Sequence, residues 1–474
     1  MSKSPNQVLL ARAAQLASDF LDGLPERSVG VQADQASLAE ALGGGLPEEG
    51  RDPLAVLERL VAAVDPGIVA SAGPRYFGHV VSGAHPAALA ADWLTAAWDQ
   101  NAVLYATSPA NAVIEEVVGR WLADLFGLSG PGRKISVGFV SGCQMAHVTA
   151  LLAARHHVLM KAGWDVERQG LFGAPRIQVF CGADAHGSVT TALQYIGLGR
   201  DHSVIIPGDD QGRMRTDLLA QAIEQGHGPA IICAQAGGVN TGAFDAFSEI
   251  ADVAQRHGAW LHVDGAFGLW AAVAPDHRYL TAGIARADSW ATDGHKWLNV
   301  PHDSGIVLTA HPAAHRAAMS VPGEPYLHKT GETYRDPYQW VPEMSRRARA
   351  IAIYAALLSF GRDGISALVA RCCRLAQRMR DHLVAADGVT ILNEVVLNQV
   401  LVRIAVPDNE IGDQITDSVI AAIQAEGTCW LGGTTWRGRR ALRISICNYR
   451  TTEADIDRSA AAILKQIERI VRNR

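Results

Sequence analysis

An acidic residue and an amine each follow a short apolar segment of the sequence. Asp264 stands in the motif His-Val-Asp-Gly-Ala, and Lys296 stands in Asp-Gly-His-Lys-Trp, thirty-two positions later. The apolar segments before them, residues 259–263 and 287–292, have the length and composition of buried strands. Ligands of open α/β sheets bind in the crevice at the carboxyl ends of the strands. We therefore expect Asp264 and Lys296 to face one crevice.

An acid and an amine in one crevice are the groups that pyridoxal phosphate (PLP) requires. The amine of Lys296 can form a Schiff base with the aldehyde of PLP, and the carboxylate of Asp264 can keep the pyridine nitrogen protonated. Each motif alone would fit a simpler role, with the aspartate capping a helix and the lysine solvated. The two motifs together, with the strand ends described next, favour a PLP site.

Two further strand ends offer a phosphate site and a planar ring. Cys143 and Gln144 follow a small-residue turn at Ser141-Gly142 and open an apolar-periodic helix. The free backbone N–H groups and the dipole of such a helix N-terminus can bind an anion, although a plain N-cap by Ser141 is the simpler alternative. His186 follows the next apolar segment. Its imidazole could lie over the pyridine ring, and we expect it at the same edge as Asp264 and Lys296.

The elements that must position these residues alternate along the middle of the chain. Short apolar segments predict strands, and amphipathic segments such as residues 146–161 and 216–225 predict helices between them. Alternating strands and helices predict a mostly parallel, doubly wound α/β sheet. The expected strands are residues 136–140, 176–181, 203–206, 230–234, 259–263, 287–292 and 305–309.

The segments before and after this region predict three domains. Residues 1–70 are expected to form an N-terminal helical arm, residues 71–345 the large PLP-binding domain, and residues 346–474 a smaller C-terminal α+β domain. Within the last we expect a long helix from Arg346 to the break at Ala386-Asp387-Gly388, strands at 399–404 and 441–446, a helix at 414–426 and a closing helix. Residues 323–341 are polar and aperiodic, which predicts a mobile active-site loop.

Composition excludes several other classes of protein. The 474 residues are 48% hydrophobic and 19% charged, which is typical of an ordered globular protein. A net charge of −6 with dispersed Lys and Arg gives no sign of nucleic-acid binding. No signal peptide and no uncharged apolar stretch long enough for a membrane span is evident. The seven cysteines lack C-x-x-C spacing and no paired Cys/His motif occurs, so we expect a cytoplasmic protein without a metal.

The order of these motifs resembles the group II PLP-dependent amino-acid decarboxylases, which include the aromatic amino-acid, tyrosine and glutamate decarboxylases. The resemblance extends from Tyr76 to Arg450. It implies PLP-dependent transferase fold type I and a lyase of amino-acid (carboxylic acid) metabolism. The matching segments are Tyr76-Phe77-Gly78-His79, Ala106-Thr107-Ser108-Pro109, Asp184-Ala185-His186, His262-Val263-Asp264-Gly265-Ala266, His295-Lys296-Trp297-Leu298 and Ser345-Arg346-Arg347.

The resemblance implies a role for each candidate cofactor residue. Lys296 would carry the Schiff base, Asp264 would pair with the pyridine nitrogen, and His186 would stack on the ring as a catalytic residue. The backbone at Cys143 and Gln144 would bind the phosphate. The remaining cofactor contacts would be Ala266 on the opposite ring face, His295 with Asp293 beside the Schiff base, and Asn240 or Thr241, which replace the family's Gly-Thr-Thr run.

The resemblance also implies a homodimer with shared active sites, in which residues 101–105 reach the pocket of the neighbouring subunit. Besides the replaced Gly-Thr-Thr run, two positions depart from the family. Met145 replaces an acidic residue at the phosphate helix, and Pro337 stands where a loop tyrosine donates a proton. Tyr338 is the expected donor, with Tyr334 as the second candidate. The expected substrate-binding residues are His79, Val80, Trp98, Asn101, Val103, Tyr105 and Trp436.

These expectations define one reaction and its rivals. We expect decarboxylation of an L-amino acid to a primary amine and CO₂, with the amino acid itself left open. A decarboxylation-dependent aldehyde synthase would follow if no tyrosine reaches the reacting carbon. An aminotransferase would need an arginine for the α-carboxylate, for which Arg443 is the candidate. A binding or scaffold module is disfavoured because Lys296, Asp264 and His186 are all present.

Overall fold

The computed structural model describes residues 4–320 and 334–472. The chain forms two compact units. Unit 1 comprises Met1–Gly83, Arg378–Thr390 and Val402–Arg474, and unit 2 comprises Ala84–Gln377 and Ile391–Leu401. The division into an N-terminal arm, a large domain and a small domain stays a prediction. In the structure, the N-terminal and C-terminal residues belong to the same unit.

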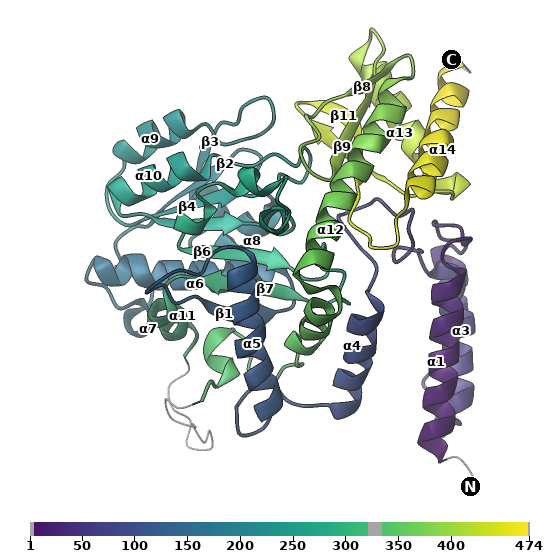
Figure 1. The fold of residues 1–474 in the computed structure, drawn as a ribbon, viewed down its shortest axis with the longest axis horizontal. Helices are drawn as coiled ribbons and strands as arrows, with labels where there is room; N and C mark the ends of the chain where they lie inside the picture. Colours follow the sequence, from purple (N-terminus) through teal and green to yellow (C-terminus); the bar gives the residue numbers. More distant parts are fainter. Residues whose placement is uncertain (1–3, 321–333, 473–474) are drawn as a thin grey trace. The chain divides into compact units, whose positions relative to one another are not determined.

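Unit 2 contains a sheet of seven strands, with helices packed along it (Figure 1). Its strands are β1 (Ser136–Val140), β2 (Gln178–Gly182), β3 (Val204–Ile206), β4 (Ala230–Gln235), β5 (Trp260–Asp264), β6 (Ser289–Asp293) and β7 (Gly305–Thr309). Its helices are α4 (Pro86–Trp98), α5 (Pro109–Leu125), α6 (Cys143–Lys161), α7 (Val166–Gln169), α8 (Gly187–Tyr195), α9 (Thr216–Glu224), α10 (Phe247–His257), α11 (Pro312–Met319) and most of α12 (Ala350–Val384).

The strand order is β1-β7-β6-β5-β4-β2-β3. The five strands from β6 to β3 are parallel, whereas β7 runs antiparallel to both β6 and β1. Four of these parallel strands, β2, β4, β5 and β6, each carry a buried apolar run, because the helices of crossover connections cover a parallel sheet. The mostly parallel, doubly wound α/β sheet of fold type I is confirmed, and the antiparallel β7 was not foreseen.

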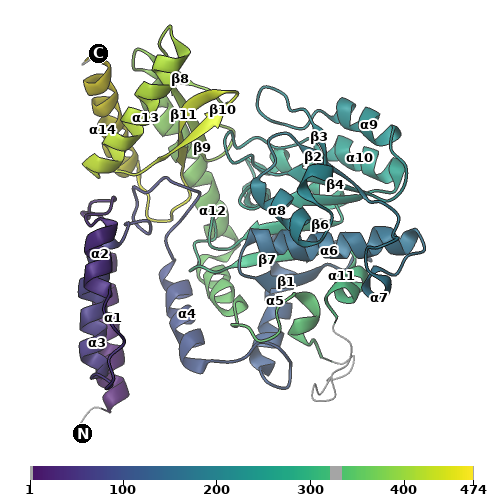
Figure 2. The same cartoon turned by 180° about the vertical axis from the view of Figure 1, so that it is seen from behind.

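Unit 1 brings the N-terminal helices together with most of a small C-terminal sheet, whose residues 391 and 399–401 belong to unit 2 (Figure 2). Its helices are α1 (Pro5–Gly23), α2 (Gln35–Leu42), α3 (Pro53–Val64), α13 (Asn409–Glu426) and α14 (Glu453–Arg472). The second sheet has the order β10-β11-β9-β8, with β8 (Val389–Ile391), β9 (Gln399–Ile404), β10 (Gly432–Trp436) and β11 (Arg439–Ser445). The expected strands 399–404 and 441–446 correspond to β9 and β11, whereas β8 and β10 were not foreseen.

Short 3₁₀ helices complete the connections: η1 (Asp65–Gly67), η2 (Arg200–His202), η3 (Gly268–Val273), η4 (Arg278–Thr281), η5 (Ile284–Arg286) and η6 (Pro337–Trp340). The long helix α12 is broken by Gly361, whose φ of +62° only glycine adopts at low cost. By length and composition alone α12 could cross a membrane. One such helix is weak evidence for a membrane span.

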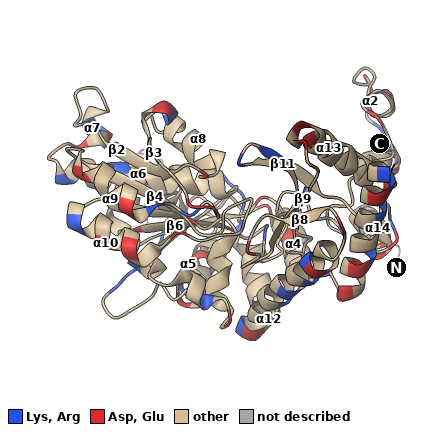
Figure 3. Cartoon of the chain, turned by 90° about the horizontal axis from the view of Figure 1, so that it is seen from above, with Lys and Arg blue, Asp and Glu red and all other residues tan. Residues whose placement is uncertain are grey.

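The charged side chains are dispersed, and the cysteine side chains are buried. Basic and acidic positions are interspersed along the described helices, as Figure 3 shows. All seven cysteines are buried and free. These observations agree with a reducing environment, although the compartment of the protein remains a prediction.

Candidate active site

The neighbouring strands β5 and β6 bring Asp264 and Lys296 to one edge of the sheet. Asp264 ends β5 and is in register with Ala291 of β6. Beyond the strands, Gly265 N donates to Ala291 O at 2.9 Å and Asp293 N donates to Ala266 O at 3.0 Å. The turn that carries Lys296 is therefore fastened to the residues that follow Asp264. The juxtaposition expected from the two motifs is present.

Lys296 is paired with a second acid that lies three residues before it. The Nζ atom lies 2.8 Å from Oδ2 of Asp293, whose side chain is 2% exposed. Burial by itself would lower the pKa of the Lys296 ammonium, but the charge of Asp293 outweighs burial and the pKa is raised. The other oxygen of Asp293, Oδ1, is buried without a hydrogen-bond partner among the described residues. The two oxygens of Asp293 thus face Lys296 and His295, with Oδ1 lying 3.7 Å from Nε2 of His295.

His295 lies beside this pair. Its Nδ1 accepts a hydrogen bond from Ser304 N at 3.1 Å, and its ring stacks on that of His302 with centroids 4.2 Å apart. Burial lowers the pKa of His295 to about 4, so the imidazole is neutral near pH 7. A neutral ring that accepts from the backbone carries its proton on the other nitrogen, Nε2, which lies 3.7 Å from Oδ1 of Asp293.

The helix α6 begins at the same edge of the sheet, directly after β1. Its N-cap is Gly142, and no side-chain hydrogen bond caps it within the described part of the chain, so the alternative of a Ser141 cap is not observed. The turn lies against β7, where a Cβ added at Gly305 would lie 2.5 Å from the Cα of Gly142. Glycine at position 305 therefore permits this close approach. The first N–H groups of α6, at Cys143 and Gln144, are available to an anion.

His186 and Ala266 lie on the elements around Asp264. His186 is the N-cap of α8, where its Nδ1 accepts a hydrogen bond from Ser188 N at 3.2 Å, and its side chain is exposed. The charge of His186 is among the influences that lower the pKa of Asp264, which places the two side chains in electrostatic range. Ala266 is half-buried and its N–H donates to Oδ1 of Asp264 at 3.0 Å. A backbone N–H group two residues later in the chain thus holds the carboxylate of Asp264.

The polar loop after β4 is less open than expected. Thr241 is 2% exposed, and its hydroxyl donates to Gln211 O at 2.7 Å. Thr241 therefore holds the loop after β4 against the segment that contains Gln211. Asn240 is half-buried beside it. Of the two candidate contacts, the structure leaves Asn240 the more accessible.

The two candidate proton donors differ strongly in exposure. Tyr338, in η6, is 2% exposed and packs against Val103 and Leu104. Tyr334 is 50% exposed, and its ring stacks on that of Tyr105 with centroids 4.2 Å apart. Most of the expected loop, residues 323–333, lies outside the described residues. Exposure thus favours Tyr334, the second candidate, over Tyr338.

The expected substrate-binding residues divide between the two units. In unit 2, the Asn101 side chain bonds to Ser345 Oγ and to Arg346 N, both at 3.2 Å, and Trp98 is 52% exposed. In unit 1, His79 and Val80 have φ values of +52° and +55°. Left-handed backbone is costly for a β-branched residue and is concentrated at functional sites. Of the other predicted residues, Val103 and Tyr105 lie in unit 2, and Trp436, which is 6% exposed, lies in unit 1.

One residue of the site was missed from the sequence. His147 of α6 is fully buried, and its Nε2 lies 3.6 Å from Oδ2 of Asp264. The available signal was its spacing of four residues from Cys143, which places both side chains on one face of the helix. Cys143, His147 and Asp264 have ligand atoms within 4.8 Å of one another, a geometry that could hold a metal ion. Burial raises the pKa of the Cys143 thiol well above its usual value, and a protonated thiol is a poor metal ligand.

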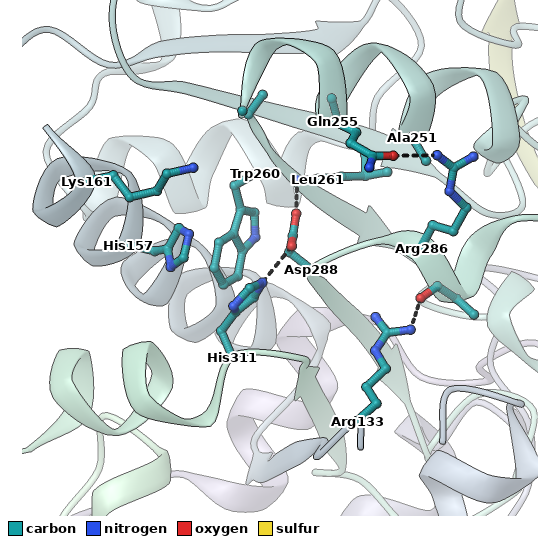
Figure 4. A pocket seen from close by; sticks show the side chains of 14 residues that line it. Arg133, His157, Lys161, Ala251, Gln255, Trp260, Leu261, Arg286, Asp288 and His311 are labelled. Carbon is teal, nitrogen blue, oxygen red and sulfur yellow. Dashed lines mark hydrogen bonds and ion pairs between the residues drawn. The ribbon is translucent and has the colours of Figure 1, made fainter. Parts of the chain in front are cut away.

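A pocket of about 520 Å³ lies at the opposite edge of the sheet, where β5 and β6 begin (Figure 4). Several of its polar groups are hydrogen-bonded within the protein. Asp288 accepts from Leu261 N at 2.7 Å and lies 2.7 Å from Nε2 of His311. Arg286 donates to Gln255 at 3.1 Å. None of the residues expected to act in catalysis lines this pocket, so the reaction belongs at the other edge.

Comparison with known proteins identifies the family of the chain. The pyridoxal-dependent decarboxylase conserved domain matches residues 37–405, and the chain belongs to this family. An acidic amino acid decarboxylase of Mus musculus is 30% identical over 328 residues, which are 68% of this chain and 58% of that protein. The chain spans 55 to 61% of the length of the first curated relatives.

Solved structures of the same fold extend over nearly the whole chain. A structure of Oryza sativa TDC with PLP and tryptamine has a TM-score of 0.92 at 21% identity and covers 99% of both chains. A structure of Rhodiola rosea 4-hydroxyphenylacetaldehyde synthase has a TM-score of 0.85 at 20% identity and covers 98% of both chains. At these identities the likeness establishes the fold.

The cofactor of this family is PLP, and the residues present fit it. The site offers a buried amine at Lys296, an ionised acid at Asp264 and an uncapped helix N-terminus at α6 for a phosphate. Burial alone would raise the pKa of Asp264, but His147 and then His186 outweigh burial and lower it well below its usual value. A carboxylate that stays ionised is what a protonated pyridine nitrogen requires.

Proposed function

We propose that the protein decarboxylates an L-amino acid to a primary amine and CO₂, with Lys296 as the PLP-binding lysine. The observation that carries the proposal is the position of Lys296 and Asp264 at the ends of adjacent parallel strands, with Asp293 paired to the amine. Bound PLP withdraws electrons from the Cα atom of the amino acid and so permits loss of CO₂. The aspartate side chain at 264 supports this by holding the ring nitrogen protonated.

The other residues position the reactants. The N–H groups of Cys143 and Gln144 would bind the phosphate at the start of α6. His186 would lie over the ring, and Ala266 would support its opposite face. Neutral His295 would donate a hydrogen bond from Nε2 close to Lys296. Asn240 would contact the cofactor from the loop after β4.

The proton that replaces CO₂ on Cα would come from a loop tyrosine. Tyr334 is the better candidate on exposure, since Tyr338 packs in the interior of unit 2. An aldehyde synthase is the second candidate function. It is supported by Pro337 at the expected donor position and by the burial of Tyr338. A fold likeness to an aldehyde synthase is consistent with it.

We further propose a homodimer with shared active sites. Helix α4 exposes Trp93, Leu94 and Trp98 by 43, 50 and 52%. Large apolar side chains gathered on one helix mark an interaction surface. A second copy that covers α4 would also lie next to residues 101–105, which follow the helix directly. Seven buried, free cysteines support a cytoplasmic location.

The test is product analysis of the PLP-loaded protein with the standard amino acids, DOPA and 2,4-diaminobutyrate. We expect equal amounts of CO₂ and a primary amine from one of these substrates. Aldehyde with ammonia and peroxide would establish the second candidate function. Amino-group transfer to a keto acid, without CO₂, would establish an aminotransferase.

A further inference from the structure

A chain of buried polar side chains extends from Asp264 into the interior of the sheet. The Nδ1 atom of His147 lies 2.9 Å from Nε2 of His262, and Nδ1 of His262 lies 2.8 Å from Oγ of Ser289. The indole Nε1 of Trp260 donates to the same Ser289 oxygen at 2.8 Å. His147, His262 and Ser289 have 0% exposure and Trp260 has 1%.

The direction of the hydrogen bonds follows from the donor capacity of each group. Trp260 can only donate, so the Ser289 oxygen accepts from it and the serine proton is free for Nδ1 of His262. Nε2 of His262 then carries the proton and donates to Nδ1 of His147. This arrangement leaves a proton of His147 on Nε2, which faces the carboxylate of Asp264 at 3.6 Å. Every donor in the chain points toward Asp264.

The alternative arrangement is unfavourable. If His262 donated to Ser289, Nε2 of His262 would be bare and His147 would have to donate from Nδ1. With a single proton on Nδ1, His147 would then turn a bare nitrogen toward a buried carboxylate, which is repulsive. Burial lowers the pKa of His262 to about 3, so this ring is neutral near pH 7. It therefore carries one proton and can donate to Ser289 or to His147, but not to both. The arrangement that donates to Asp264 is therefore preferred.

From this geometry we propose that His147, supported by His262 and Ser289, is a positioning residue. It keeps Asp264 ionised and oriented for the pyridine nitrogen of PLP. The inference rests on the proposed role of Asp264. The wall formed by Trp260 separates the far end of the chain from the pocket in Figure 4, so water does not compete for these hydrogen bonds.

Several other titratable groups act on the same carboxylate and must be considered in any pH dependence. They are Cys143 on α6, His186 at the start of α8, Cys233 on β4, and Asp293 and Lys296 after β6. The thiols of Cys143 and Cys233 have pKa values raised, with burial as a cause, and stay uncharged. His147 is the basic group within 4 Å of Asp264 among the described residues. Its removal should therefore have the largest effect.

The test measures the protonation of the pyridine nitrogen directly, by ¹⁵N NMR of ¹⁵N-labelled PLP bound to the intact protein across a pH series. In His147→Leu the carboxylate loses the imidazole that faces Oδ2, while Ala266 N still donates to Oδ1. An opposite charge or donor at this range shifts a pKa by about 1–3 units. We expect the pyridine nitrogen of this variant to lose its proton at a pH lower by at least about one unit. His147→Gln, which keeps an amide donor, should restore part of the shift.

Control variants separate the effect of the hydrogen-bonded chain of His147, His262 and Ser289 from a general structural effect. His156→Leu alters a half-buried histidine of the same helix that pairs with Glu167, away from His147, His262 and Ser289, and it should leave the titration unchanged. Ser289→Ala, which leaves the imidazole of His147 in place, should shift the titration in the same direction and serves if His147→Leu does not fold. An unchanged titration of the pyridine nitrogen in both His147→Leu and Ser289→Ala would overturn the inference. If Asp264→Asn also leaves the nitrogen protonated, then the role of Asp264 is wrong instead.

Discussion

Lys296 and Asp293 form an ion pair in which Nζ lies 2.8 Å from Oδ2, with Asp293 as the last residue of β6 and Lys296 three residues later. The pair is nearly enclosed, since the side chains of Lys296 and Asp293 are 21% and 2% exposed. Asp293 therefore determines the charge of the amine that has to react with an aldehyde. Substitution of Asp293 should therefore change the pKa of Lys296.

Lys296→Ala should abolish both turnover and the long-wavelength absorbance band that PLP acquires on forming a protonated Schiff base. The reason is that Lys296 is the amine placed at the end of β6 beside Asp293. Lys161→Ala, which removes an exposed lysine at the other end of α6, is the matched control and should keep both properties. Wild-type turnover in Lys296→Ala would show that another lysine binds the cofactor.

Asp293→Asn should shift the pH dependence of PLP capture by the apoprotein to lower pH. Asp293 is the main influence that raises the pKa of Lys296, and without it burial lowers that pKa. Only the neutral amine attacks the aldehyde, so a lower pKa gives more reactive amine at a given pH. Stopped-flow absorbance across a pH series measures the shift. The exposed Asp276→Asn serves as control, and an unshifted profile in Asp293→Asn contradicts the prediction.

Tyr334→Phe should slow amine formation by about 10²–10⁴-fold, the usual contribution of a general acid. Tyr334 is half exposed beside Tyr105, whereas Tyr338 is buried. Aldehyde and peroxide should increase in Tyr334→Phe, and simultaneous assays of amine and peroxide measure both outcomes. If Tyr338→Phe has this effect and Tyr334→Phe does not, the order of the two candidates must be reversed.

Glu115→Gln should lower the free energy of unfolding by about 3–5 kcal/mol, because it leaves buried cations without their partner. Glu115 is completely buried and pairs with Arg346 at 2.6 Å and with Arg335 at 3.4 Å. Urea denaturation followed by tryptophan fluorescence measures the loss. Glu116→Gln changes the exposed neighbour and should have little effect. Equal stability of the two variants would show that the pairs contribute nothing.

Mixing subunits tests the proposed shared active site. An inactive Lys296→Ala subunit mixed with an impaired Tyr334→Phe subunit should regain activity if the loop acts on the neighbouring subunit. One of the two sites in such a hybrid would then contain both wild-type residues. Sedimentation should show a dimer. An active monomer would contradict the proposal.

The sequence determined the strands of the central sheet and the residues at their ends. Short apolar runs bounded by Gly and polar residues located all seven strands of that sheet within a few positions. Asp264, Lys296, His186 and the start of α6 could be placed at one edge because parallel strands end on the same side of a sheet. These features depend on local pattern and on chain direction, which a sequence displays.

The tertiary structure alone decided which side chains meet across long separations. His147 and His262 are 115 positions apart, and their contact depends on how α6 packs across β5. The burial of Tyr338 and the occupied hydroxyl of Thr241 depend likewise on packing against segments distant in the sequence. The antiparallel β7 follows from the order of strands in the sheet, which local pattern does not specify. Contacts of this kind result from packing, because burial and hydrogen-bond satisfaction are properties of the assembled interior.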